Sequence, residues 1–207
     1  MKISLNNIKV AIFDFDDTLA IHKDVDYLKH RNENEEKLLN YYLNAYLNPE
    51  KFYEIIEPCD ISESILKLIN ILRKNNVKIY CVSGMKFSFH LKAKEYFVHK
   101  CYGDDIEVIS SKNQELKIDA AKIISKINKC KLNEVLFVDD MKENIINFNK
   151  AGINAILANN VELLINDKVG KNNESISENK LIEIINEKLN LSNITRLELE
   201  SNLYWLE

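Results

Sequence analysis

Residues 10–18 read Val-Ala-Ile-Phe-Asp-Phe-Asp-Asp-Thr, so an apolar run leads directly into acidic residues. Four similar runs follow along the chain, and the five together have the length and β-branched content of strands: 10–15, 78–82, 106–109, 134–138 and 153–157. Most of them are apolar at nearly every position, which is typical of strands covered on both faces. The sequence therefore predicts a parallel sheet between two layers of helices.

Helical segments separate these runs. Residues 62–74 and 114–128 place apolar side chains at helical spacing, and Ala151-Gly152 ends a third, shorter helix. The alternation predicts the α/β class, a doubly wound, Rossmann-like parallel sheet with a small helical cap inserted after the first strand. We expect a core over 1–20 and 59–165, a cap over 21–58, and a polar loop with a C-terminal helical tail over 166–207.

Composition limits the class of protein. Of 207 residues, 46% are hydrophobic and 29% are charged, which excludes an intrinsically disordered chain. The formal net charge of −4 argues against nucleic acid as a partner, because a backbone-binding surface needs an excess of clustered Lys and Arg. The four cysteines form no C-x-x-C pair, and no cleavable leader or membrane-spanning run is visible. We therefore expect reduced thiols, a cytoplasmic location and no membrane partner.

Acidic side chains end two of the predicted strands, at the carboxyl edge of the sheet, where doubly wound folds have their ligand-binding and active sites. Asp14 and Asp16 lie two apart, so on an extended strand they project to one side. One carboxylate of such a pair can attack phosphorus while the other handles the proton of the leaving group. Because these carboxylates repel each other and the phosphate, the chemistry needs a divalent cation.

The acidic pair Asp139-Asp140 ends another strand and supplies the other side of that cation site. Oxygen ligands without His or thiolate indicate Mg²⁺ as the cofactor. Adjacent strand residues face opposite ways, so only one of the two side chains is expected to touch the metal directly.

Three further residues suit the binding of a phosphoryl group. Ser83 offers a hydroxyl, and Gly84 lets a backbone N–H approach a phosphate oxygen closely. Lys117 adds a positive charge, and its position leaves room for one helix, a turn and a strand before the acidic pair. Lys112 and Lys122 are close enough in the sequence to be alternatives to Lys117.

Together these residues resemble the haloacid dehalogenase (HAD) superfamily, in its branch of phosphatases that form an aspartyl phosphate. The resemblance covers residues 8 to about 158 and leaves the tail unexplained. Four motifs occur in the order of the family: D-x-D-x-T at Asp14, Asp16 and Thr18, a strand-ending Ser83, a lysine at Lys117, and the acidic pair Asp139-Asp140.

The resemblance implies a role for each acidic position. Asp14 would be the nucleophile that forms a phosphoaspartate, and Asp16 the general acid that protonates the leaving group and then activates water. Mg²⁺ would bind the Asp14 carboxylate, the Asp16 backbone carbonyl and the Asp140 carboxylate. Asp139 would then hold a metal-bound water.

The resemblance also implies the remaining site residues. Ser83, the Gly84 amide and Lys117 would hold the phosphate. Thr18, grouped with these phosphate-site residues, would shape the loop after the nucleophile. Residues 21–58 lie where the family inserts its first type of cap, although they are too few for a full helical cap domain.

The expected function is that of a Mg²⁺-dependent phosphatase, a phosphoric monoester hydrolase acting on a small phosphorylated metabolite. Two alternatives within the superfamily stay open: a phosphotransferase and a nucleic-acid end phosphatase, the latter disfavoured by the acidic charge balance. A third alternative is a module that binds phosphorylated ligands without turnover, because a fold does not guarantee a function. The substrate stays open, as does the choice between a monomer and a homodimer.

Overall fold

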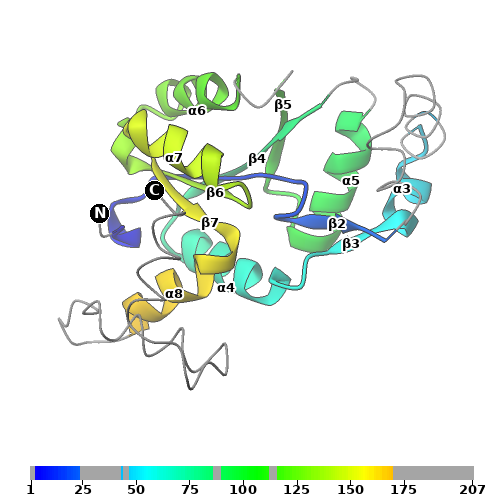
Figure 1. The fold of residues 1–207 in the computed structure, drawn as a ribbon, viewed down its shortest axis with the longest axis horizontal. Coiled ribbons are helices and arrows are strands. Elements are labelled where there is room, and N and C mark those ends of the chain that lie inside the picture. Colours follow the sequence, from blue (N-terminus) through cyan, green and yellow to red (C-terminus); the bar gives the residue numbers. More distant parts are fainter. Residues whose placement is uncertain (1–2, 24–42, 44–46, 86–89, 112–115, 170–207) are drawn as a thin grey trace, which may run out of the picture. The chain divides into compact units, whose positions relative to one another are not determined.

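The computed structural model describes residues 3–23, 43, 47–85, 90–111 and 116–169, and all structural statements concern these residues. Their centre is a sheet of five parallel strands in the order β5-β4-β1-β6-β7 (Figure 1). The strands are β1 Val10–Phe13, β4 Lys78–Gly84, β5 Glu107–Ser111, β6 Val135–Asp139 and β7 Asn154–Leu157. The predicted fold class, a doubly wound parallel sheet, is confirmed.

The strand order reverses next to β1. From β1 the chain continues to β4 and β5 on one side, and then crosses to β6 and β7 on the other. In open parallel sheets of this kind, ligands bind outside the carboxyl ends of the strands where the order reverses. The ends of β1 and β6 are therefore where a site is expected.

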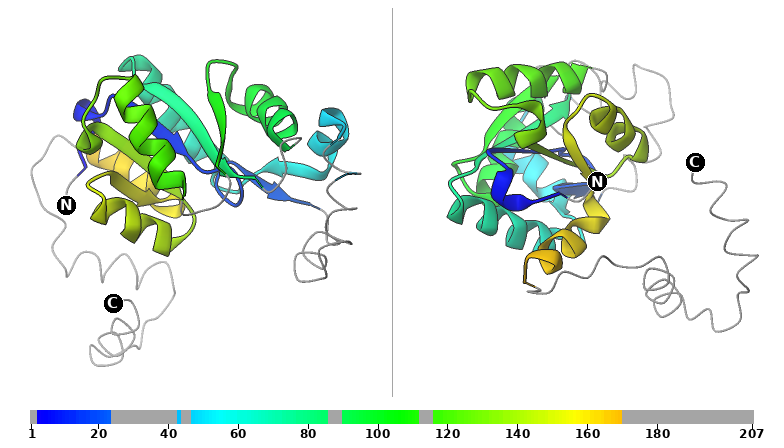
Figure 2. Two further views of the ribbon diagram at one scale, coloured as in Figure 1. Left: turned by 90° about the horizontal axis from the view of Figure 1, so that it is seen from above. Right: turned by 90° about the vertical axis from the view of Figure 1, so that its left-hand side faces the viewer.

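Helices cover both faces of the sheet (Figure 2). Helices α4 Ser62–Lys74 and α8 Val161–Val169 lie on one face, and α6 Leu116–Ile127 and α7 Lys142–Lys150 on the other. Successive β1 side chains point to opposite faces, so Ala11 and Phe13 join the first layer, and Val10 and Ile12 join the second. All four are buried, which explains why this strand is apolar throughout instead of alternating.

The described part of the predicted cap is a small ribbon with one helix. Strands β2 Ala20–His22 and β3 Ile56–Pro58 pair in antiparallel fashion, and α3 Pro49–Ile55 precedes β3. The Asn48 side chain caps α3 by accepting the backbone N–H of Glu50 at 2.9 Å. Residues 24–42 and 44–46, which belong to the predicted helical cap, lie outside the described residues, as does the tail 170–207.

Helix α5 His90–Tyr102 connects the cap to the core. Phe52 of α3 packs on Phe15, with ring centroids 6.2 Å apart, and Phe15 packs on Phe97 of α5 at 5.6 Å. Phe52 is fully buried, so this residue of the cap belongs to the core. Three 3₁₀ turns complete the described elements: η1 Leu5–Asn7, η2 Leu132–Glu134 and η3 Ala158–Asn160.

Two element ends differ from the expectation. Strand β1 ends at Phe13, two residues early, because the Phe15 carbonyl turns to accept the backbone N–H groups of Leu19 and Ala20 at 2.9 and 3.0 Å. Helix α8 runs to Val169, into the segment expected to be a polar loop, and Ile165 anchors it in the core. In the part of the chain that the structure describes, no helix is long and apolar enough to cross a membrane. The four cysteines are free thiols, as expected.

Candidate active site

Asp14 is held at the carboxyl end of β1, between the ends of β4 and β6. Its backbone N–H donates to the Val138 carbonyl at 2.9 Å, so the β1–β6 ladder extends one residue beyond the strand. The chain then turns sharply, and Asp17 adopts a left-handed conformation with φ of 55° that Asp tolerates better than most residues. The turn fixes Asp14 at the sheet edge and leaves Asp17 exposed.

Lys117 reaches Asp14 from the first turn of α6. Its Nζ lies 2.7 Å from Asp14 Oδ1 and 3.4 Å from Asp139 Oδ2, and the Lys117 side chain is completely buried. Burial alone would lower the pKa of Lys117, but the two carboxylates outweigh it and hold the pKa above its ordinary value. A positive charge is thus fixed between two of the predicted site acids.

Asp139 is the acid of this site with the most donors around it. The Asn144 amide donates to both of its carboxylate oxygens, at 3.0 and 2.9 Å, and the Met141 backbone N–H donates to Oδ1 at 2.8 Å. With Lys117 this makes three groups that hold one fully buried carboxylate. Asp140 is exposed, which favours Asp140 as the member of the pair with oxygens available to a cation.

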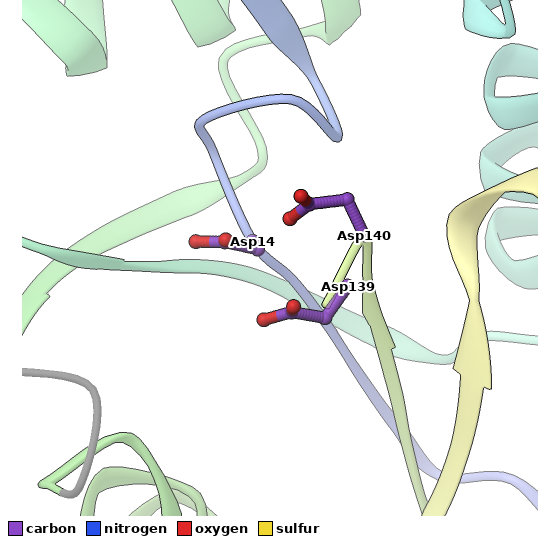
Figure 3. A group of neighbouring side chains, drawn as sticks. All are labelled: Asp14, Asp139 and Asp140. Atoms are coloured by element: carbon purple, nitrogen blue, oxygen red, sulfur yellow. The ribbon is translucent and has the colours of Figure 1, made fainter. Parts of the chain in front are cut away.

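The carboxylates of Asp14, Asp139 and Asp140 form a group that fits a divalent cation. One oxygen from each lies within 4.8 Å of the others, and the three side chains project to the same side of the β1 and β6 ends (Figure 3). Asp139 and Asp140 therefore do not face opposite ways as expected, because β6 ends at Asp139 and Asp140 lies beyond the strand. Burial raises the pKa of Asp14 to about 7, with Lys117 opposing the rise and Asp139 adding to it. Burial and the Asp139 charge likewise raise the pKa of Asp140 to about 6. Crowded acids of this kind are stabilised by a bound cation, and oxygen ligands suit Mg²⁺.

A second lysine holds the other carboxylate of the D-x-D pair. Lys94 of α5 places its Nζ 2.7 Å from Asp16 Oδ2 and 2.8 Å from Ser83 Oγ, and Ser83 Oγ lies 3.5 Å from the same Asp16 oxygen. The Lys94 side chain is only 3% exposed. Partial loss of water would raise the pKa of Asp16, but the charge and hydrogen bond of Lys94 hold it below its ordinary value.

The remaining predicted residues are Thr18, Gly84 and the two alternative lysines. Thr18 is completely buried, and its hydroxyl has no hydrogen-bond partner among the described residues, so its contact with phosphate stays a prediction. Gly84 is the last residue of β4, directly after the buried Ser83. Of the alternative lysines, Lys122 pairs with Asp119 at 3.0 Å on an exposed surface, and Lys112 lies outside the described residues.

Known proteins match this chain in structure and not in sequence. No family model and no curated protein sequence matches the chain. Among solved structures, a haloacid dehalogenase-like hydrolase from Streptococcus pneumoniae matches 72% of this chain and 83% of its own, with 11% identity and a TM-score of 0.51. The chain has the HAD fold. The resemblance seen in the motifs is thereby confirmed for the fold.

Two further solved structures have lower TM-scores. A HAD-family enzyme from Bacteroides thetaiotaomicron in a magnesium complex matches 73% of this chain and 93% of its own, with 17% identity and a TM-score of 0.48. A phosphoserine phosphatase with an analogue of its phospho-aspartyl intermediate matches 69% and 82%, with 18% identity and a TM-score of 0.45. Only 17% and 18% of the residues are identical, so the chemistry must be argued from the side chains of this chain.

Two residues of the site were not predicted from the sequence. Asn144 lies in the first turn of α7, within the segment that follows the acidic pair, and a polar residue at this position is the only signal the sequence offers. Lys94 is one of several lysines along α5, and nothing in the sequence pattern distinguishes it from its exposed neighbour Lys92. Both depend on contacts that only the folded chain makes.

Proposed function

We propose that the chain is a Mg²⁺-dependent phosphatase that hydrolyses a small phosphorylated metabolite through a phosphoaspartate on Asp14. The observation that carries the proposal is the grouping of three carboxylates around one candidate cation position, with the Lys117 ammonium 2.7 Å from Asp14. A phosphate dianion can approach a carboxylate nucleophile only where positive charge offsets their repulsion. This site offers a fixed cation and ligands for a second.

The metal would be held by oxygen atoms of the chain. Asp14 and Asp140 would contribute carboxylates, and the Asp16 backbone carbonyl would complete the protein ligands. Asp139 would act from further out, because Lys117, Asn144 and the Met141 amide already occupy its oxygens. When bound, Mg²⁺ supplies positive charge to the phosphoryl oxygens and to the nucleophile.

The first step forms the phosphoaspartate. A carboxylate oxygen of Asp14 attacks phosphorus, an O–P bond forms, and the P–O bond to the leaving group breaks. The leaving oxygen takes its proton from the Asp16 carboxyl group, which the negative charge of the bound phosphate would protonate by opposing the Lys94 charge that holds its pKa low in the free protein. Lys117, fixed beside the nucleophile, and the Ser83 hydroxyl orient the phosphoryl group during the transfer.

The second step releases the phosphate. A water oxygen attacks phosphorus while Asp16, now a carboxylate, accepts a proton from that water. The bond between phosphorus and Asp14 breaks, inorganic phosphate leaves, and the Asp14 carboxylate is regenerated. The same side chain thus gives a proton in the first step and takes one back in the second.

Hydrolysis of p-nitrophenyl phosphate, with Mg²⁺ and after its removal with EDTA, tests the proposal. Asp14→Asn replaces the nucleophile at nearly constant volume, so we expect turnover to be lost while the fold is kept. Asp17→Asn is the matched control, because Asp17 is exposed in the same turn and Asn accepts its left-handed backbone. Undiminished turnover by the Asp14 variant would reject the mechanism.

A panel of substrates separates the alternative functions. We expect release of phosphate from sugar phosphates or nucleoside monophosphates in preference to 3′-phosphorylated oligonucleotides, in line with the net charge of −4. A phosphotransferase would pass the phosphoryl group to an added alcohol, which yields a new phosphate ester in place of inorganic phosphate. A binding module would bind phosphate and release none.

A further inference from the structure

The buried lysine of α5 has no part in the motifs that suggested the site. Lys94 has only 3% of its side chain exposed, and its Nζ lies between the Asp16 carboxylate at 2.7 Å and the Ser83 hydroxyl at 2.8 Å. Its ammonium also lies 4.4 Å from the centroid of the Phe15 ring, in the turn that carries Asp16. A buried charge is costly unless it is paired, and here the Asp16 carboxylate supplies the opposite charge.

The two carboxylates of the D-x-D pair, Asp14 and Asp16, contact different lysines. Lys117 serves Asp14 and Asp139 from α6, whereas Lys94 serves Asp16 and Ser83 from α5. Asp16 is the more exposed acid, with 40% of its side chain accessible, and a carboxylate at the end of a turn has several rotamers open to it. The Lys94 ammonium donates one hydrogen bond to Asp16 Oδ2 and one to Ser83 Oγ, and this pair of bonds selects the rotamer that turns Asp16 toward Ser83.

We propose that Lys94 is a positioning residue, which holds the Asp16 carboxyl group against Ser83 so that its proton can reach the leaving oxygen. The inference rests on the proposed phosphatase function. Because Ser83 is the predicted phosphate anchor, an acid fixed beside its hydroxyl stands next to the phosphoryl group that the hydroxyl binds. A carboxyl group free to rotate would spend less time in that position, and a small misplacement costs a large factor in rate.

The leaving group provides the test. In the first step, Asp14 forms its bond to phosphorus as the bond to the leaving oxygen breaks, and an alkoxide must receive a proton whereas a nitrophenolate leaves without one. In Lys94→Met we therefore expect a 10- to 100-fold fall in single-turnover alcohol release from an alkyl phosphate, on the order expected for a misplaced acid. The burst of nitrophenol from p-nitrophenyl phosphate should be kept, and only the steady-state rate of nitrophenol release should fall.

Two comparisons make the result specific. The burst amplitude counts folded, competent sites, so a folding defect is read separately from a chemical one. Lys92→Met removes an exposed lysine of the same helix and should change neither measurement. If Lys94→Met does not give folded protein, Lys94→Gln is measured in the same way, since it lacks the charge and keeps a donor.

A double variant tests whether Lys94 acts through Asp16. If it does, adding Lys94→Met to Asp16→Asn lowers alcohol release little further, because groups that act as a unit are strongly non-additive. Additive losses, a lost nitrophenol burst, or weaker inhibition by inorganic phosphate in Lys94→Met would overturn the inference and indicate direct phosphate binding. An inactive wild type, or an active Asp14→Asn, would instead reject the phosphatase function itself.

Discussion

The Nζ of Lys117 lies 2.7 Å from Oδ1 of Asp14, with both side chains at most 5% exposed. A buried ion pair of this kind is weak evidence for stability, because both charges have lost their water. Its consequence is local. If Lys117 is removed, the Asp14 carboxylate, which lies where the strand order reverses, becomes an unpaired buried charge. That dependence can be measured without any substrate.

Lys117→Met is expected to destabilise the fold as well as abolish phosphatase activity. Without Mg²⁺ the change leaves the Asp14 charge unpaired and removes one of the three groups that hold Asp139, and the free energy of unfolding should fall by about 3 kcal/mol. A bound divalent cation replaces part of the missing charge, so the loss should be smaller at millimolar Mg²⁺. Urea denaturation with Mg²⁺ and with EDTA measures both values.

Lys122→Met is the control for that experiment. Lys122 lies on the same helix, but its side chain is 46% exposed and pairs with Asp119 at 3.0 Å. We expect a change within about 0.5 kcal/mol, as for surface substitutions in general. Equal losses in the two variants would show that the burial of Lys117 does not set the stability of the site.

Asn144→Ala is expected to weaken the metal site without changing the fold. Asn144 donates to both oxygens of Asp139, and loss of such an outer partner typically costs 10- to 100-fold in metal affinity or activity. The Mg²⁺ concentration that gives half-maximal activity should therefore rise by about tenfold. Asn147→Ala removes an exposed amide of the same helix, and a similar rise there would contradict the assignment.

The parts of the fold that follow local rules could be predicted from the sequence. The apolar runs around Ala11 and Leu136 are strands because both of their faces are buried, and the polar residues after them lie at one edge because parallel strands end together. The same rule predicts from the sequence that Asp14, Ser83 and Asp139 lie at one edge of the sheet.

The rest depends on contacts between segments far apart in the chain. Lys94 is 78 residues from Asp16, and one residue on a helix becomes part of a site only when that helix packs with the correct rotation. The choice of Lys117 over Lys122 likewise depends on which face of α6 meets the sheet, and both lysines suit a helix equally well. The predicted end of β1 at residue 15 is wrong, because the turn from Phe15 to Ala20 takes the chain out of the sheet and β1 ends at Phe13.

Gly103→Ala is expected to destabilise the junction between α5 and β5. Gly103 has a φ of +119°, where residues with a side chain are strained, and an added Cβ would lie 2.8 Å from the Asp105 carboxylate and closer still to Arg73. We expect a loss of about 3 kcal/mol in the free energy of unfolding. Gly152→Ala is the control: its φ is +81°, but no atom lies within 4 Å of the added Cβ, and about 1 kcal/mol is expected. Equal losses would mean that backbone strain alone, without the clash, decides the effect.

Asp105→Asn is expected to lower stability at neutral pH and to have no effect in acid. The Arg73 guanidinium donates from Nε to Asp105 Oδ2 at 2.9 Å and from Nη2 to the Tyr102 carbonyl at 2.6 Å, and it holds the pKa of Asp105 below its usual value. A lowered pKa in the folded state stabilises the protein above the unfolded value of about 4 and is lost as the pH falls through the folded value. For a half-exposed pair we expect about 1 kcal/mol at pH 7, shrinking progressively as the pH is lowered through about 4 to about 2. Urea titrations of wild type, Asp105→Asn and the exposed control Asp104→Asn at both pH values measure it, and a difference that persists in acid would refute the role of this pair.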